Sequence, residues 1–375
     1  MNEEVVYGRA TLPVGIRSKF VDGGDGVRIH VLEAGFEHRG RCVVLLHGFP
    51  ELAYCWRKQL LPLARAGFHV LAPDLRGYGR TWGAGVTYNE DLASYAPSKY
   101  VSDTLALVAA FGYEDVVAVV GHDWGSPIAA WCARTRPEIF RAAVLMSSPF
   151  EGSRTSSLAD PHNKLNMEAA LAGLARARKH YQWYYATREA NEEMWHAPQG
   201  VHDFLRAYYH VKSADWQGNR PFALKSWSAS ELAQMPSYYI MDLDKGMADT
   251  VALEMPSRAQ MAMWLPDAEL QVCSAEYTRT GFQGGLQLYR VATHPLYEAE
   301  LHGLADGTID VPCCFIAGAR DWGVYQSPGA FEAMQSSCTR MLGVHLVEGA
   351  GHWVQQEQPD PVNQLLIGFL RRVSG

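Results

Sequence analysis

The sequence predicts an α/β fold in which a mostly parallel sheet carries an inserted helical lid. Short apolar runs alternate with helix-like stretches in the first 150 residues, and the same alternation returns near residue 313. The segment between these two parts has a different character. With 375 residues, 48% of them hydrophobic, the chain is long and apolar enough to bury one large core with an insertion.

The first part of the chain has the pattern of β-α units. We expect strands at VRIHVLEAG (27–35), CVVLLHG (42–48), FHVLAPD (68–74), VVAVVG (116–121) and AAVLMSS (142–148). We expect helices at RKQLLPLARAG (57–67), KYVSDTLALVAAFG (99–112) and SPIAAWCARTRP (126–137). This alternation is typical of parallel strands with helices on both faces of the sheet.

The middle of the chain lacks parallel-strand runs and is rich in Trp, Tyr and Met. Its helix-like stretches include EAALAGLARARKHYQWYYA (168–186) and, near the far edge, PLYEAELHGLADG (295–307). Strand patterns then return at 313–319 and 343–352, before an amphipathic helix at 359–372. We therefore predict a core built from residues 1–148 and 296–375, a helical lid at 149–295, and a ligand cleft between them.

Composition excludes several classes of partner. The net charge is −7 and there is no Lys/Arg-rich block, so nucleic acid is not expected. The acidic start and the absence of a long apolar stretch indicate no membrane insertion and a cytoplasmic location. Seven cysteines without a C-x-x-C pair indicate reduced thiols and no metal site. No cofactor is expected. We expect a monomer or a homodimer.

The segment GHDWG (121–125) joins an expected strand to an expected helix, with a glycine two positions on either side of Asp123. Such a tight turn pushes the central side chain out at the end of the sheet and turns the Trp124 N–H toward the same space. This is the pattern of the nucleophile elbow of the α/β-hydrolase fold, with aspartate as nucleophile. The alternative is that Asp123 only caps the helix.

Two further residues follow in the order that α/β-hydrolases use, which is nucleophile, acid and histidine. Asp321 comes after an expected strand in ARDWG, and His352 lies on a glycine-rich loop in GAGHW. The order favours a catalytic triad of Asp123, Asp321 and His352. Glu151, after the strand ending in SSPF, is the alternative acid, and His352 has the alternative of a hydrogen-bonded core histidine.

The loop HGFP (47–50) follows another expected strand. Beside an elbow, such a loop supplies the second N–H of an oxyanion hole, here Phe49 N–H paired with Trp124 N–H. The alternative is an ordinary Gly-Pro turn. The sequence leaves open whether the Phe49–Pro50 peptide is cis.

These motifs together resemble the soluble epoxide hydrolase family over nearly the whole chain: HGFP, GHDWG, ARDWG and GAGHWVQQEQPDPVNQLLIGFL (349–370). In the lid, HYQWYY (180–185) and RTGFQGGLQLYR (279–290) are similar to the two lid-tyrosine segments of that family. The resemblance implies Tyr181 and Tyr289 as the lid donors, with Tyr184 or Tyr185 left open as the first donor. Residues expected to contact the substrate are His47, Gly48, Pro50, Gln182 and Trp183.

The residue types fit one kind of chemistry. An aspartate is already ionised at neutral pH, and its attack on a saturated carbon leaves a stable alkyl ester. An epoxide supplies such a carbon, and two phenols can protonate the departing oxygen. The resemblance implies hydrolysis of an apolar or aromatic epoxide with water to a vicinal diol, with His352 activating the water.

Two other functions remain open from the sequence. A haloalkane or haloacid dehalogenase uses the same aspartate, and Trp124 does not discriminate between the two reactions. The paired tyrosines favour an epoxide, because a halide leaves without a proton, and no arginine lies next to Asp123 to bind a haloacid. A non-catalytic lidded binder of small molecules is the third possibility.

Overall fold

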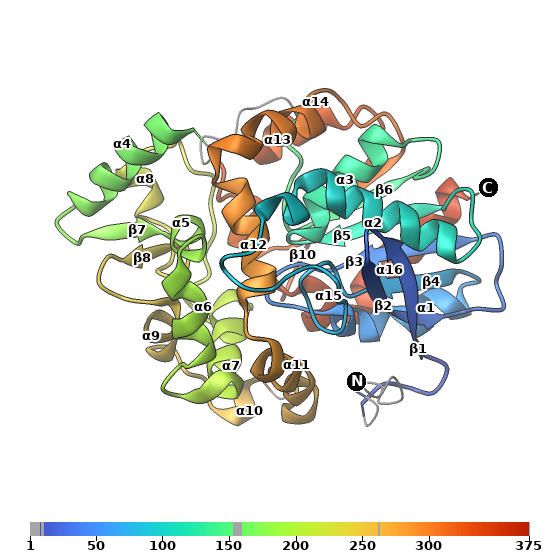
Figure 1. Ribbon diagram of the computed structural model, residues 1–375, viewed down its shortest axis with the longest axis horizontal. Coiled ribbons are helices and arrows are strands. Elements are labelled where there is room, and N and C mark those ends of the chain that lie inside the picture. The colour runs from blue at the N-terminus through green and yellow to red at the C-terminus, as the bar shows by residue number, and fades with distance from the viewer. Residues whose placement is uncertain (1–7, 9–10, 153–159, 262, 375) are drawn as a thin grey trace.

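An eight-stranded sheet forms the centre of the core, on the right of Figure 1. The computed structural model describes residues 8, 11–152, 160–261 and 263–374. The order across the sheet is β1-β2-β4-β3-β5-β6-β9-β10, in which only the β1/β2 and β2/β4 pairs are antiparallel. The strands are β1 (Arg17–Gly24), β2 (Val27–Ala34), β3 (Cys42–Leu46), β4 (His69–Pro73), β5 (Ala118–His122), β6 (Ala143–Met146), β9 (Cys313–Gly318) and β10 (Met341–Val347).

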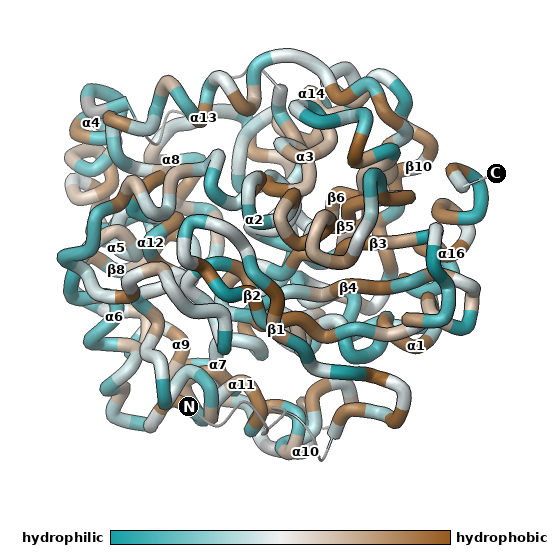
Figure 2. The backbone as a smooth tube through the Cα atoms, turned by 45° about the vertical axis from the view of Figure 1, so that its right-hand side comes forward, coloured by the Kyte–Doolittle hydropathy of each residue, from teal (hydrophilic) through white to brown (hydrophobic). Residues whose placement is uncertain are grey.

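The mostly parallel sheet expected from the sequence is confirmed, and each expected strand is present. β1 is an additional strand at the antiparallel edge. Only one of its eight residues is buried, and RSKFVDGG contains no apolar run that sequence patterning could detect. The central strands β3, β4 and β5 are buried along their whole length, and they carry hydrophobic colours in Figure 2.

Helices cover both faces of this sheet, as the βα alternation predicts. In β3, Val44 and Leu46 belong to one hydrophobic cluster, while Val43 and Leu45 belong to the other, which also holds residues of α1 and α16. Successive side chains of a strand point to opposite faces, so one short strand supports both layers. The core helices are α1 (Arg57–Arg65), α2 (Pro97–Ala110), α3 (Gly125–Thr135), α14 (Ala330–Ser337), α15 (Val354–Glu357) and α16 (Pro359–Val373), with 3-10 turns η1 (Ala53–Trp56), η2 (Leu92–Tyr95) and η4 (Trp322–Val324).

A helical lid is inserted between β6 and β9 and forms the left-hand lobe of Figure 1. Its elements are α4 (Pro161–Ala172), β7 (Arg178–His180), α5 (Tyr181–Tyr185), α6 (Arg188–Trp195), α7 (Gly200–Lys212), α8 (Ala229–Leu232), β8 (Ile240–Asp242), α9 (Met247–Ala252), α10 (Arg258–Met261), α11 (Asp267–Thr280) and α12 (Gln283–Ala292). After it come η3 (Pro295–Tyr297) and α13 (Glu298–Ala305), which contacts α2 and α3.

One expectation for the lid is wrong. The stretch 168–186 is not a single helix, because α4 ends at Ala172 and β7 pairs antiparallel with β8 before α5 begins. The backbone hydrogen bonds of β7 are made to a segment some 60 residues later, so nothing local in the sequence marks this strand. The lid limits at 149 and 295 stay predictions, and residues 153–159 lie outside the described part.

Three glycines, Gly77, Gly284 and Gly285, let α12 dock closely on the core. A Cβ placed on Gly284 would lie 2.0 Å from the carbonyl oxygen of Gly77, and one on Gly285 would lie 2.7 Å from the ring of Tyr78. Gly77 also has a φ of +84°, which favours glycine. The GYG turn of the core and the QGG start of α12 therefore fit together only with glycine at these three positions. This contact fixes the helix that carries Tyr289.

Asp74 stabilises the segment that contains the GYG turn, and we expect its removal to destabilise the protein. Its carboxylate is buried and accepts hydrogen bonds from the backbone N–H groups of Ala53 (2.8 Å) and Arg80 (3.0 Å), and it pairs with His30 Nδ1 at 2.8 Å. Asp74→Ala leaves these donors buried without partners, which typically costs about 3 to 5 kcal/mol. Urea denaturation measures this loss of unfolding free energy.

The matched control is Asp115→Ala. Asp115 pairs with Arg141 at the surface, where an ion pair contributes about 1 kcal/mol or less. Equal denaturation midpoints for Asp74→Ala and Asp115→Ala would contradict the structural role of Asp74.

Candidate active site

The GHDWG segment forms a sharp turn between β5 and α3. Asp123 has a φ of +54°, a left-handed conformation that is uncommon for aspartate. A Cβ on Gly121 would lie 1.8 Å from the carbonyl oxygen of Gly125, and one on Gly125 would lie 2.2 Å from that of Leu46. Both glycines are therefore required for this turn, which presents Asp123 at the carboxyl end of the sheet.

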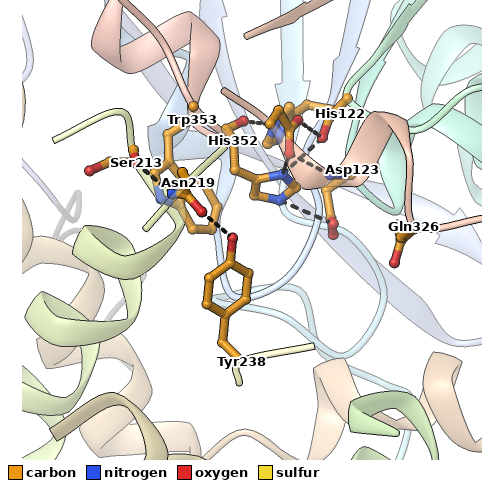
Figure 3. Close-up of polar contacts among 12 residues, drawn as sticks. His122, Asp123, Ser213, Asn219, Tyr238, Gln326, His352 and Trp353 are labelled. Carbon is orange, nitrogen blue, oxygen red and sulfur yellow. Dashed lines mark hydrogen bonds and ion pairs between the residues drawn. The ribbon is translucent and has the colours of Figure 1, made fainter. Parts of the chain in front are cut away.

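The carboxylate of Asp123 is held from two sides. Its Oδ1 accepts a hydrogen bond from Phe49 N–H at 2.9 Å, and its Oδ2 lies 3.3 Å from Nε2 of His352. Figure 3 shows the imidazole of His352 directed toward this carboxylate. Burial alone raises the pKa of Asp123, but the hydrogen bond and charge of His352 outweigh it and hold the pKa well below the ordinary value. Asp123 is therefore ionised throughout the neutral range.

His352 is oriented by groups on the other side of its ring. Nδ1 lies 3.1 Å from Oδ1 of Asp321 and 2.8 Å from Oγ of Ser147, and the Ser147 hydroxyl donates to the second oxygen of Asp321. This network places the Nδ1 proton toward Asp321 and directs Nε2 to Asp123. Burial and the Lys212 charge lower the pKa of His352, but Asp321 and Asp123 raise it above the ordinary value.

Asp321, and not Glu151, is thus the acid beside His352. Asp321 is buried, and its pKa is lowered because the charge and hydrogen bond of His352 outweigh the effect of burial. Glu151 instead lines a cavity of about 210 Å³ next to Trp124. The sequence order of nucleophile, acid and histidine therefore corresponds to a real cluster in space.

The HGFP loop lies directly against the elbow. A Cβ on Gly48 would lie 2.4 Å from the Cβ of Asp123 and 2.7 Å from the backbone nitrogen of Trp124, so only glycine fits. The Phe49–Pro50 peptide is cis. Phe49 N–H donates to the Asp123 carboxylate, and the backbone nitrogen of Trp124 lies beside the position of Gly48. An oxyanion hole formed by these two N–H groups stays a prediction.

Other residues of the loop make contacts within the protein. His47 is fully buried, its Nδ1 contacts the Gly48 carbonyl at 2.9 Å, and its Nε2 accepts from Leu75 N–H at 3.0 Å. Burial lowers its pKa, so the ring is neutral. The Pro50 carbonyl accepts from the Tyr209 hydroxyl at 3.0 Å. His47 and Pro50 therefore shape the loop, and their expected contact with substrate stays a prediction.

Tyr181 and Tyr289 lie over this site from the lid. The rings of Tyr289 and Trp124 are 5.2 Å apart and those of Tyr181 and Tyr289 are 6.1 Å apart, measured between centroids. Burial raises the pKa of both phenols well above the ordinary value, and the charge of Asp123 raises it further. Both hydroxyls therefore stay protonated and lie within electrostatic reach of the carboxylate.

The other tyrosines of HYQWYY have different partners. The Tyr184 hydroxyl donates to Glu193, and the Tyr185 hydroxyl donates to that of Tyr208 at 3.1 Å. Trp183 is buried and lines a different, outer cavity of the lid together with Tyr184. Tyr184 and Tyr185 thus donate their protons to other lid side chains. Of the three candidates for the first donor, only Tyr181 does not.

Comparisons with known proteins agree with this geometry. Residues 41–234 match the family model described as alpha/beta hydrolase fold. Epoxide hydrolase B of Mycobacterium tuberculosis (strain ATCC 25618 / H37Rv) is 31% identical over 359 residues, or 92% of this chain and 96% of the relative. Epoxide hydrolase A of the same strain is 32% identical over 350 residues, covering 92% and 95%.

An epoxide hydrolase from an endophytic Streptomyces has the same fold, with a TM-score of 0.77 at 31% identity and 96% of each chain covered. The chain belongs to the epoxide hydrolase family. The family and the α/β-hydrolase fold expected from the motifs are thereby confirmed.

Three residues near the site of this epoxide hydrolase family member were missed by sequence reasoning. Ser147 has a φ of +71° and contacts both Asp321 and His352, but serine at a strand end carries no distinctive signal. Lys212 is buried, with its ammonium 5.2 Å from the Tyr239 ring centroid, and it ends a lid helix. Gln326 lies five residues after Asp321 and accepts a hydrogen bond from Tyr181.

His122, next to Asp123, makes buried contacts within the core. Its ring lies 3.0 Å from Oε2 of Glu51 through Nδ1 and 2.7 Å from the His352 carbonyl oxygen through Nε2. It therefore fixes the backbone at His352.

In the part of the chain that the structure describes, no group of three or more His, Cys, Asp or Glu residues is arranged to hold a metal ion. Nor does any helix within those residues combine the length and apolar character needed to cross a bilayer.

Proposed function

We propose that this chain adds water to an epoxide with an apolar or aromatic substituent and releases a vicinal diol, through an ester on Asp123. One observation carries the proposal: the Asp123 carboxylate lies between Phe49 N–H at 2.9 Å and His352 Nε2 at 3.3 Å, below the rings of two lid tyrosines. The family membership of the chain supports the same reaction.

In the first step, Oδ2 of Asp123 attacks an epoxide carbon while Phe49 N–H holds Oδ1. The new carboxylate oxygen to carbon bond forms as the ring C–O bond breaks, and the departing oxygen takes a proton from Tyr181 or Tyr289. The raised pKa of each phenol retains its proton until the more basic alkoxide develops. The product of this step is an alkyl ester of Asp123.

In the second step, His352 removes a proton from water, and the resulting hydroxide attacks the ester carbonyl carbon. The negative charge that develops on the carbonyl oxygen is stabilised by the Phe49 and Trp124 N–H groups, each donor typically contributing about 2.7 to 4 kcal/mol. Asp321 keeps the Nδ1 proton of His352 in place. As the acyl C–O bond breaks, the departing alkoxide takes the proton of the newly added hydroxyl, which frees the diol and restores the carboxylate.

Replacement of the lid phenols is expected to slow ring opening. In Tyr181→Phe or Tyr289→Phe one acid is lost and the other remains, and general acid catalysis is worth about 10² to 10⁴-fold in total. We expect the rate of ester formation to fall by about tenfold or more in each variant and further in the double variant. Stopped-flow tryptophan fluorescence measures this rate, and unchanged rates in all three variants would exclude these donors.

The hydrolysis step is expected to fail in acid before ester formation does. The hydrogen bond with Asp123 helps to raise the pKa of His352, so esterification of Asp123 removes that contribution and favours the neutral base. Below the pKa of His352 in the ester, hydrolysis should fall by about tenfold per pH unit, while Asp123, with its lowered pKa, still attacks. Single-turnover measurements from pH 5 to 8 should show ester accumulating as the pH falls.

The choice of substrate distinguishes the proposal from its alternatives. Incubation with styrene oxide and, separately, with a chloroalkane should give diol from the first and no chloride from the second. Release of chloride without diol formation would identify a dehalogenase. Binding of both compounds without turnover would indicate a non-catalytic binder.

We also propose a cytoplasmic location and a monomer or homodimer. All seven cysteines are buried free thiols, as is usual for proteins of a reducing compartment. Cell fractionation tests the location, and size-exclusion chromatography with light scattering tests the assembly.

A further inference from the structure

Gln326 lies in the core loop between η4 and α14, and its side chain connects this loop to the lid. The Tyr181 hydroxyl donates to Oε1 of Gln326 at 3.0 Å, and the same hydroxyl accepts from Nε2 of Gln182 at 3.0 Å. In the view of Figure 3, Gln326 is drawn on the side of Asp123 that faces away from His352. The Tyr181 proton, which the proposed reaction transfers to the epoxide oxygen, is therefore engaged in a hydrogen bond to a glutamine of the core.

The two amides act on the phenol in opposite ways. A tyrosine hydroxyl has one proton, so Tyr181 cannot donate to Gln326 and to an epoxide oxygen at the same time. The Gln182 N–H lowers the pKa of Tyr181, although burial and Asp123 raise it by more. A carbonyl oxygen facing a phenolate is repulsive, whereas an amide N–H facing it is favourable. The terminal amide of a glutamine offers either group after a half-turn.

The cavity beside Trp124 reaches the two glutamines, Gln182 and Gln326, that bind the Tyr181 hydroxyl. It has a volume of about 210 Å³ and is lined by Gln182 and Gln326 together with the aromatic side chains of Trp124, Trp131, Phe150 and Trp227. An aromatic or apolar substituent fits such a surface. The epoxide oxygen of a substrate seated against Asp123 would then compete with Gln326 for the Tyr181 proton.

We propose that Gln326 is a positioning residue for Tyr181. Its carbonyl directs the phenol proton before the substrate arrives, and its amide then turns to donate to the tyrosine oxygen during ring opening. The proposal rests on the proposed epoxide hydrolysis. As the Asp123 ester bond forms and the epoxide C–O bond breaks, the electron pair on the released oxygen takes the Tyr181 proton. The phenolate regains a proton at the end of the cycle from His352, which took it from water.

The test is Gln326→Glu, which keeps the shape and the acceptor but removes the donor. At pH 8 the introduced carboxylate cannot donate, so we expect the rate of ester formation to fall by about tenfold or more, with ester hydrolysis within about threefold of wild type. As the pH falls and the carboxyl is protonated, ester formation should recover, while that of wild type stays flat. Stopped-flow fluorescence with styrene oxide measures both steps.

The pH dependence of ester formation in Gln326→Glu has to be distinguished from effects of other titratable groups near Tyr181. The titratable groups that line the same cavity are Glu151, His180 and His302, and Asp123 and Tyr289 lie near Tyr181. All of them are present in wild type and in the control Gln364→Glu, which alters an exposed glutamine of α16. Recovery in acid should therefore be seen in Gln326→Glu alone.

A second variant keeps the inference testable if the first does not fold. Gln326→Met has neither donor nor acceptor, so its ester formation should be slow at every pH. A wild-type rate in Gln326→Met, or a wild-type rate and flat profile in Gln326→Glu, would show that the contact only joins lid and core. If wild type forms neither ester nor diol, the proposed function fails instead, so the two failures are distinguishable.

Discussion

Asp123→Asn is expected to abolish diol formation and to leave the fold unchanged. An amide is a poor nucleophile, and loss of the nucleophile in enzymes that form covalent intermediates typically costs about 10⁴-fold or more in rate. The asparagine fits the same turn, because asparagine tolerates a positive φ as well as aspartate does, and its oxygen can still accept from Phe49 N–H. Gas chromatography of the diol measures the effect.

Two controls make this result specific. Asp115→Asn changes a half-exposed aspartate outside the site in the same way and should keep full activity. Mass spectrometry of the Asp123→Asn peptide has to show that the asparagine has not deamidated, since traces of aspartate would restore turnover. Wild-type diol formation by an intact asparagine variant would end the assignment of Asp123 as nucleophile.

Much of the fold can be predicted from local sequence patterns, above all from the apolar runs that mark buried strands. The strands β3, β5 and β9 are buried on both faces, so their sequences are continuous apolar runs that stand out. β1 and β7 are not detectable in this way, because one is a half-exposed edge strand and the other has three residues whose partners are remote. The lid was predicted as an insertion, but its internal arrangement depends on contacts far apart in the chain.

The candidate site divides in the same manner. Asp123, Asp321 and His352 follow strands in short glycine-containing motifs, so their type and order identify them, and the structure brings them together. Ser147 and Gln326 contact the same groups but come from segments without a motif, so only the three-dimensional arrangement identifies them. Sequence motifs therefore identify the three residues of the triad. Ser147 and Gln326, which contact those residues or Tyr181, can be identified only from the folded structure.

His352→Gln is expected to stop the reaction after its first half and to trap the substrate on the protein. Ester formation needs Asp123 and a lid phenol, both of which remain. Ester hydrolysis needs a base for water, and its loss typically costs about 10² to 10⁴-fold. The intact protein should therefore gain the full mass of one epoxide, because ring opening is an addition without a leaving fragment, and the modified peptide should contain Asp123.

The trapped ester also decides between a covalent route and direct attack of water on the epoxide. If His352 activated water for direct attack, His352→Gln would lose turnover without gaining mass. The control His345→Gln changes a half-buried histidine of β10 and should turn over normally with no adduct. Asp123→Asn combined with His352→Gln should show no added mass. An adduct in the double variant would mean that another side chain is alkylated, and the covalent role of Asp123 would fall with it.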